Sequence, residues 1–253
     1  DGGEAWFEQT DSIQMALFAI QVGLVALWRS WGVEPDAVVG HSMGEVAAAY
    51  VAGVLSLEDA VSILYHRNQL IRGVLGKGKM LAIGLTLEQA RETLAGQEAL
   101  VSIAISNSPK STVLSGDPGA LEKIAASLKD QGTFHRWINV DFASHSPQMD
   151  VLLPDLRKAL RNLSPRKATI PIISTVTGMA SDGTEMDTEY WIRNLREPVL
   201  FADATRWLRE HDYEVFVEIS PHPVLLPSIE DSLYHLNLPG TVLPSLRRNT
   251  DEQ

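Results

Sequence analysis

The pattern of apolar and polar positions predicts helices that alternate with strands, beginning with a long apolar segment at residues 12–28. Its apolar side chains recur at steps of three and four, which indicates an amphipathic helix whose apolar stripe faces the core. The stripe consists of Ile13, Leu17, Ile20, Leu24, Leu27 and Trp31. The segment also contains Gln14, Gln21 and Gly23 and is too short for a membrane span, so we expect no membrane partner.

A short apolar run at residues 37–39 predicts a buried strand, and an Ala-rich helix follows from Gly44 to about residue 54. The turn between them is Gly40-His41-Ser42-Met43-Gly44, a G-x-S-x-G motif in the strand–turn–helix context that gives it meaning. We expect both glycines to be required, because a tight turn leaves no room for side chains beside the serine. The motif predicts Ser42 as a nucleophile, with the helix N-terminus placed to stabilise an oxyanion.

The pattern changes after residue 75 to shorter elements in the order strand, helix, strand, strand, helix, strand. The strands are expected at 80–85, 100–106, 111–115 and 134–140, and the helices at 86–95 and 118–129. This order is typical of a ferredoxin-like unit. We therefore predict an α/β protein in which a small ferredoxin-like (βαββαβ) subdomain, residues 76–142, is inserted into a larger subdomain made of residues 1–75 and 143–253.

The rest of the larger subdomain again alternates helices with strands. Helices are predicted at 149–163, 201–210 and 223–233, and strands at 170–176, 214–219 and 241–243. Such alternation indicates a mostly parallel sheet that is covered by helices on both faces.

Composition narrows the possible functions. The 253 residues include no cysteine, which excludes disulfides, thiolate metal sites and a cysteine nucleophile and fits a cytoplasmic location. A formal net charge of -11 argues against nucleic acid as a partner. The chain does not open on a basic segment followed by an apolar one, so no secretion signal is expected. We predict no metal site and no cofactor.

A serine nucleophile needs a base, and the chain offers seven histidines. His145 lies where the small subdomain ends and the larger one resumes, and such junctions border clefts. His222 follows the end of a predicted strand and is the second choice. His41 adjoins Ser42, but its side chain is expected to point the other way. From the residues alone, His145 is only modestly favoured over His222.

Gly40-His41-Ser42-Met43-Gly44-Glu45 resembles the signature of the malonyl-CoA:acyl-carrier-protein transacylase family, specifically the acyltransferase domains of modular type I polyketide synthases. The resemblance implies Ser42 as the nucleophile, Arg67 as the residue that binds a substrate carboxylate, and His145 as the general base. Further substrate-binding candidates are Met43, His41, Phe142, Ser144 and Asn107. Further similar segments span residues 55–60, 113–117, 190–199 and 216–225.

The resemblance implies a hydrolase-like larger subdomain and a ping-pong reaction. Ser42 attacks a malonyl-type CoA thioester, and the acyl group then passes to the phosphopantetheine thiol of an acyl carrier protein. Flanking synthase domains, a ketosynthase and linkers, are implied as further partners. Asp141 stands four residues before His145 and could complete a triad. The family instead works as a Ser–His dyad with the histidine held by a backbone carbonyl, so Asp141 receives no role.

Two departures from the family pattern affect this expectation. The family's upstream Gly-Gln-Gly-rich oxyanion motif and its strand are absent from the sequence, which leaves a sheet edge unpaired. The residues that indicate the acyl group also conflict. Ser144 leaves room for an α-methyl group and favours methylmalonyl, whereas Met43 replaces a glutamine that is frequent in methylmalonyl enzymes.

Two alternatives remain open. A serine esterase or thioesterase would use the same nucleophile with water as the acceptor, although it would have no need of Arg67. A catalytically idle docking domain is the other alternative, since the oxyanion motif is absent.

Overall fold

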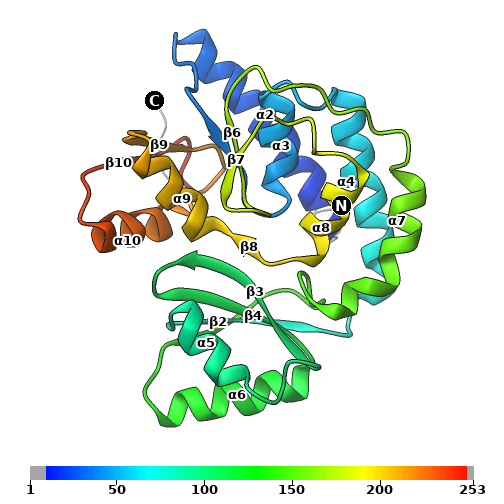
Figure 1. The fold of residues 1–253 in the computed structure, drawn as a ribbon, viewed down its shortest axis with the longest axis vertical. Helices are drawn as coiled ribbons and strands as arrows, with labels where there is room; N and C mark the ends of the chain where they lie inside the picture. Colours follow the sequence, from blue (N-terminus) through cyan, green and yellow to red (C-terminus); the bar gives the residue numbers. More distant parts are fainter. Residues whose placement is uncertain (1–9, 250–253) are drawn as a thin grey trace.

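The computed structural model describes residues 10–249, so the outermost parts of the predicted larger subdomain, residues 1–9 and 250–253, lie outside it. The chain forms a larger and a smaller part (Figure 1). In Figure 1 the smaller part lies below, with β2, β3 and β4 next to α5 and α6. The larger part above it holds the remaining helices.

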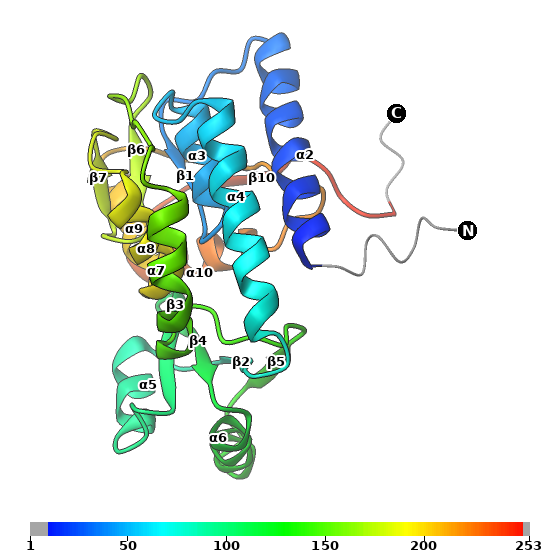
Figure 2. The same cartoon turned by 90° about the vertical axis from the view of Figure 1, so that its right-hand side faces the viewer.

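Three helices run side by side along one face of the larger part (Figure 2). They are α2 (Thr10–Ser30), α3 (Gly44–Val51) and α4 (Leu57–Ile71), and the 3-10 turn η1 (Arg72–Val74) ends the series. The start of α4 is fixed by its cap, because the Ser56 hydroxyl accepts a hydrogen bond from the Asp59 amide. Helices α2 and α3 were predicted from the sequence close to these bounds.

The larger part contains two separate sheets where a single, mostly parallel sheet was predicted. The first sheet has the order β1 (Val38–Val39), β6 (Ile172–Ser174) and β7 (Met179–Ser181); β1 and β6 are parallel, and β7 is antiparallel to β6. The second pairs β9 (Val215–Glu218) with β10 (Thr241–Pro244) in parallel. Within residues 10–249 no strand pairing joins β1 to β9. A cavity of about 1120 Å³ is lined by both strands and by α2.

The smaller part is built on a five-stranded sheet with the order β5-β2-β4-β3-β8. Its elements are β2 (Lys79–Ile83), α5 (Leu87–Leu94), β3 (Val101–Ser108), β4 (Ser111–Gly116), α6 (Pro118–Asp130) and β5 (His135–Ile138). The four strands β2 to β5 pair antiparallel, and α5 and α6 pack on them through a buried apolar cluster. The fifth strand, β8 (Val199–Leu200), comes from far along the chain and pairs in parallel with β3. The sheet therefore extends beyond the predicted boundary at residue 142.

The remaining helices are η2 (Pro147–Leu152), α7 (Leu153–Ala159), α8 (Thr188–Arg196), α9 (Phe201–Glu210) and α10 (Leu226–Leu236). The helix predicted at 149–163 is divided into η2 and α7. The helix predicted from residue 223 begins at Leu226, because the Glu218 carboxylate accepts the amides of Val224, Leu225 and Leu226 and holds this entry segment outside the helix. The strand β7, the strand β8 and helix α8 were not predicted.

The predicted orientation of the first helix is wrong. Of its apolar stripe Leu24 is buried, whereas Ile13, Ile20, Leu27 and Trp31 are exposed. The helix packs on α3 and α4 through another face, which includes Phe18, and Ile13 and Leu17 of the stripe line the cavity between the two sheets. The prediction that this segment is too short for a membrane span is also wrong, because the window Ile13–Ser30 is long and apolar enough by length and composition alone. Of this window, 11% is buried. Core helices and signal sequences satisfy the same criterion.

The turn between β1 and α3 requires glycine at one of the two predicted positions. A Cβ atom at Gly40 would lie against the backbone N and Cα of Glu45 and 2.6 Å from the Gly44 carbonyl carbon. A Cβ atom at Gly44 would have only the Gln21 Nε2 within 4 Å, at 3.8 Å, which is ordinary contact. The expectation that Gly44 is sterically required is therefore wrong, because the first turn of α3 directs this position into open space.

Gly40→Ala is expected to destabilise the protein by about 1–3 kcal/mol or more, because the backbone of α3 has to move away from the new methyl group. Gly44→Ala is the matched control and is expected to be neutral or stabilising by up to about 1 kcal/mol, since alanine favours the helix. Urea denaturation of the wild type and both variants measures the difference. Equal midpoints for Gly40→Ala and wild type would show that the close approach is no constraint.

Candidate active site

The structure brings Ser42 and His145 together. The Ser42 hydroxyl lies 2.8 Å from the His145 Nε2, although the residues are 103 positions apart in the chain. Both have left-handed backbone conformations, with φ of +53° for Ser42 and +58° for His145. Non-glycine residues adopt this region rarely and at a cost of about 1–3 kcal/mol, and such strain concentrates at functional sites. Ser42 lies at the apex of the turn before α3.

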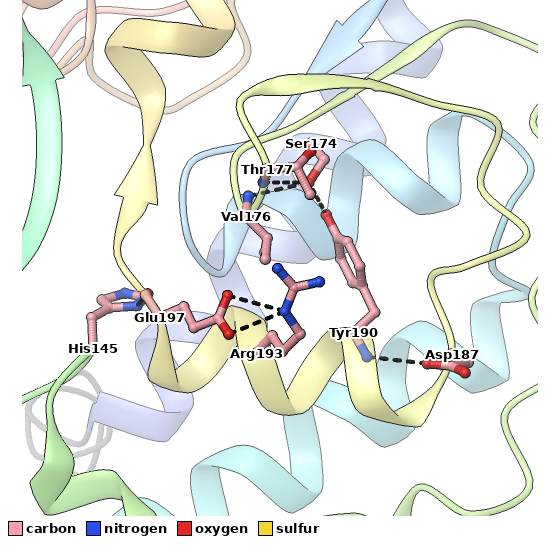
Figure 3. A network of polar contacts seen from close by, with 8 residues as sticks. All are labelled: His145, Ser174, Val176, Thr177, Asp187, Tyr190, Arg193 and Glu197. Carbon is pink, nitrogen blue, oxygen red and sulfur yellow. Dashed lines mark hydrogen bonds and ion pairs between the residues drawn. The ribbon is translucent and has the colours of Figure 1, made fainter.

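A backbone carbonyl fixes the other side of the His145 ring. Its Nδ1 donates to the Glu197 carbonyl oxygen at 2.8 Å, so Nε2 is the nitrogen that accepts from the Ser42 hydroxyl. Figure 3 places His145 beside Glu197 at the end of α8. The pKa of His145 is lowered to about 3, mainly by burial and also by the nearby Arg67 charge, while the hydrogen bond to Glu197 acts in the opposite direction. The ring is thus neutral and able to accept a proton. Asp141 is exposed and forms no part of this arrangement.

Arg67 extends from α4 toward the same cavity and is only 4% exposed. Its Nη1 donates to the Asn194 Oδ1 at 2.8 Å, while its Nε is buried and has no partner among the described residues. Burial lowers the pKa of Arg67 to about 10, and the Glu45 charge opposes this shift, so the guanidinium stays cationic at neutral pH. A buried cationic donor without an acceptor is costly, which makes this edge of Arg67 suitable for an anionic ligand.

The other predicted residues divide into two groups. Met43, Phe142 and Ser144 line the cavity together with Ser42. His41 also lines it, but its Nε2 pairs with the Asn107 Oδ1 at 2.8 Å and its ring packs edge-on against Phe201. Asn107 is thus held by His41 and is not one of the described residues that line the cavity.

His222, the second choice for the base, does not pair with Ser42. It lines the cavity, and its Nδ1 accepts the Arg248 amide at 3.3 Å. Within residues 10–249 no group of three or more histidine, aspartate or glutamate side chains could hold a metal ion.

A buried polar cluster that was not predicted lies beneath Ser42. Glu45 on α3 is fully buried, and its carboxylate accepts hydrogen bonds from Tyr190, the Thr175 amide and Asn194 at 2.7, 2.8 and 2.7 Å. Figure 3 shows Tyr190 reaching from α8 toward Ser174, whose hydroxyl lies 2.6 Å from its own. Burial raises the pKa of Glu45 to about 7, and the hydrogen bonds from Tyr190 and its other neighbours limit the rise.

A signal for this cluster exists in the sequence. Glu45 is the only charged residue of the otherwise apolar α3, and Tyr190 and Asn194 are four residues apart and so share one face of α8. A glutamate that cannot reach solvent requires donors from elsewhere in the chain. Which donors it finds depends on how α8 packs against α3.

Comparisons with known proteins identify close relatives. A family model described as "Acyl transferase domain" matches residues 2–253. Erythronolide synthase EryA2 of Saccharopolyspora erythraea is 45% identical over 91% of this chain. Spectinabilin polyketide synthase system protein NorC of Streptomyces orinoci is 47% identical over 97%. The chain spans 6% of the length of the first relative and 11% of the second.

Solved structures of acyltransferases are also similar to this chain. The acyltransferase domain from module 8 of the salinomycin polyketide synthase has a TM-score of 0.94 and 42% identity, covering 96% of this chain and 57% of that one. The malonyl CoA-acyl carrier protein transacylase of Coxiella burnetii has a TM-score of 0.88 and 26% identity, covering 97% of this chain and 79% of that one. The mixed α/β arrangement described above is thus that of these acyltransferase structures.

The lowered pKa of His145 gives a prediction for its titration. The folded protein should keep this ring neutral from pH 8 down to about pH 5, because burial and the Arg67 charge disfavour the imidazolium. Histidine-selective ¹³C labelling and NMR titration would measure it, with His145→Ala used to assign the signal. A midpoint near 6.5 for the His145 resonance would contradict the burial described here.

Proposed function

The chain belongs to the acyl transferase domain family, in the form found in modular polyketide synthases, and from this membership we propose that it transfers a malonyl-type acyl group from CoA to the phosphopantetheine thiol of an acyl carrier protein. One observation carries the proposal. The Ser42–His145 pair and Arg67 border the same cavity, and the buried Nε of Arg67 has no hydrogen-bond partner among the described residues. A nucleophile, a base and an anion-binding group are thus within one site.

The reaction takes place in two half-reactions through an acyl-enzyme. His145 Nε2 removes the proton of the Ser42 hydroxyl as Oγ bonds to the thioester carbonyl carbon. The tetrahedral intermediate collapses, the C–S bond breaks, and the imidazolium returns the proton to the CoA thiolate. In the second half-reaction His145 takes the proton of the carrier thiol, whose sulfur attacks the acyl-Ser42 ester, and Ser42 leaves with that proton. Atoms and charge balance in each half.

The groups around Ser42 assist this chemistry. The Met43 amide follows the nucleophile at the start of α3, where the helix dipole is positive, and it serves as an oxyanion donor. His145 needs no carboxylate partner, since the Glu197 carbonyl already fixes its tautomer. The site needs no cofactor beyond the phosphopantetheine that the carrier protein brings.

Arg67 defines the class of acyl group. Its Nε edge can hold a planar carboxylate through two parallel hydrogen bonds, which lysine cannot reproduce. Ser144 is small, buried and beside His145, so it leaves space for an α-methyl substituent. We assign the substrate as malonyl-CoA or methylmalonyl-CoA, with Ser144 favouring the methyl group.

Membership of the family also supports an assignment of the two parts of the fold and of the neighbouring domains. The strand order β5-β2-β4-β3 with α5 and α6 supports the ferredoxin-like assignment of the smaller part, and the β1–turn–α3 elbow supports a hydrolase-like assignment of the larger. We assign the chain to a cytoplasmic synthase in which it adjoins a ketosynthase, linkers and a carrier protein, without nucleic acid or membrane partners.

Ser42→Ala is expected to abolish covalent acylation while the protein stays folded, because in the proposed reaction the acyl group is bonded to the protein through the Ser42 Oγ alone. Intact-protein mass spectrometry after incubation with malonyl-CoA and methylmalonyl-CoA measures the adduct. Ser127→Ala, on the exposed face of α6, is the control and should acylate as the wild type does. An adduct that persists in Ser42→Ala would overturn the assignment.

Arg67→Ala is expected to lower kcat/KM for malonyl-CoA and methylmalonyl-CoA by about 100-fold or more, since a carboxylate left unpaired in a buried site costs several kcal/mol. Acetyl-CoA carries no such charge and should lose little. Competition assays between the three thioesters measure this, with the exposed Arg157→Ala as the matched control. An unchanged preference in Arg67→Ala would exclude carboxylate binding and favour an esterase.

A further inference from the structure

Asn194 on α8 connects three groups of the site through one amide. Its Oδ1 accepts from the Arg67 Nη1 at 2.8 Å. Its Nδ2 donates to the Glu45 Oε2 at 2.7 Å and to the Ser42 carbonyl oxygen at 3.2 Å. Asn194 and Glu45 are both buried. The amide thus uses its acceptor on the arginine and its donors on the glutamate and the nucleophile's own backbone.

Glu45 determines which way this amide faces. Tyr190, the Thr175 amide and Asn194 all donate to Glu45, an arrangement that suits its ionised form. An ionised carboxylate only accepts, so the NH₂ group of Asn194 faces it. The amide oxygen is therefore turned toward Arg67. In the reversed orientation two oxygens would meet at Glu45 and two N–H groups would meet at Arg67. Both contacts would leave buried polar atoms unpaired, which is costly.

The orientation of Asn194 in turn limits how the guanidinium of Arg67, a residue that lines the cavity, can turn. Because Nη1 is engaged, the guanidinium is held with its Nε unpartnered. A guanidinium is planar and rigid, so fixing one nitrogen limits the direction of the others. No other hydrogen bond from a described residue holds this guanidinium, which makes Asn194 its principal support.

Glu45 also contacts the elbow from the other side. The Thr175 amide and hydroxyl lie 2.8 and 3.3 Å from its two carboxylate oxygens, and the same hydroxyl donates to the Gly40 carbonyl at 2.9 Å. The Gly40 carbonyl is thus connected to the Glu45 carboxylate through Thr175, and the Ser42 carbonyl is connected to it through Asn194.

We propose that Glu45 is a positioning residue that sets the selectivity for carboxylated acyl groups, by orienting Asn194 so that Arg67 presents its free edge to the cavity. The inference rests on the proposed function, because it assumes that Arg67 receives a substrate carboxylate. Glu45 does not touch the substrate. Its effect reaches the acyl group only through Asn194 and Arg67.

Glu45→Gln tests this with almost no change in shape. The new NH₂ group replaces one of two acceptor oxygens where every neighbour donates. Where it takes the place of the oxygen that faces Asn194, this residue can keep its pairing only by reversing its amide. That reversal turns an NH₂ group toward Arg67 and displaces the guanidinium. We expect kcat/KM for malonyl-CoA and methylmalonyl-CoA to fall by about 10- to 100-fold, the usual effect of a lost hydrogen bond to a charged group. Acetyl-CoA should change much less, with the loss appearing mainly in KM.

A second substitution tests the route through Asn194. In Glu45→Gln/Asn194→Asp the aspartate offers one oxygen to the Gln amide and the other to Arg67, so part of the selectivity should return. Asn194→Asp alone sets two carboxylates against each other and should impair the enzyme. Such a partial rescue is not expected if Glu45 only stabilises the fold.

Tyr190→Phe is the matched control, since it removes a hydrogen bond at the other oxygen of Glu45 and leaves Asn194 in place. It should lower Tm without changing the ratio of malonyl to acetyl kcat/KM by more than about 2-fold. The proposal is overturned if Glu45→Gln keeps the wild-type ratio of malonyl to acetyl kcat/KM while Arg67→Ala lowers it. It is also overturned if Tyr190→Phe lowers this ratio as much as Glu45→Gln does. If the wild type itself shows no preference that depends on Arg67, the proposed function fails, and the inference fails with it.

Discussion

The cost of burying charge constrains the centre of this protein. Arg67 and Glu45 are both buried, and an ion taken out of water without compensation costs several kcal/mol. Glu45 is compensated by donors from α8 and from the segment after β6, whereas Arg67 has a single acceptor. The asymmetry defines the site. The anion is satisfied by the protein itself, and the cation keeps donors for a ligand.

The backbone strain at Ser42 and His145 is held in place by contacts from the surrounding structure. Ser42 and His145 both have positive φ, which isolated chains avoid, so the surrounding packing has to hold them. The Glu197 carbonyl holds the ring of His145, and the cluster around Glu45 holds the backbone on both sides of Ser42. The protein alone thus holds Ser42 and His145 in place, and in the proposed acyl transfer this lowers the reorganisation needed in the transition state.

Local patterns in the sequence predicted most of the helices and the motif at Ser42, because these depend on residues close together in the chain. Ser56, Thr86 and Asp117 cap α4, α5 and α6, and each lies directly before its helix. Features that depend on distant packing were not predictable in this way. The exposed stripe of α2, the division of the sheet and the short strand β8 are examples.

The candidate site shows the same limit. Ser42, Arg67 and His145 could be named from motifs and from a family resemblance, and the structure places them at one cavity. Asn194 could not be given a role, because its three contacts come from residues 127, 152 and 149 positions away in the chain. Gly44 was predicted to be sterically required because it belongs to the motif, but the structure leaves room for a Cβ atom there.

The short strand β8 has a consequence for internal motion. It pairs with β3 of the smaller part, yet it begins two residues after Glu197, whose carbonyl holds His145. If the larger and smaller parts rotate relative to each other, either the β3–β8 pairing breaks or β8 moves with the smaller part. In the second case the Glu197 carbonyl, which holds the His145 ring, is displaced as well. The position of His145 beside Ser42 therefore depends on the same short segment that joins the two parts.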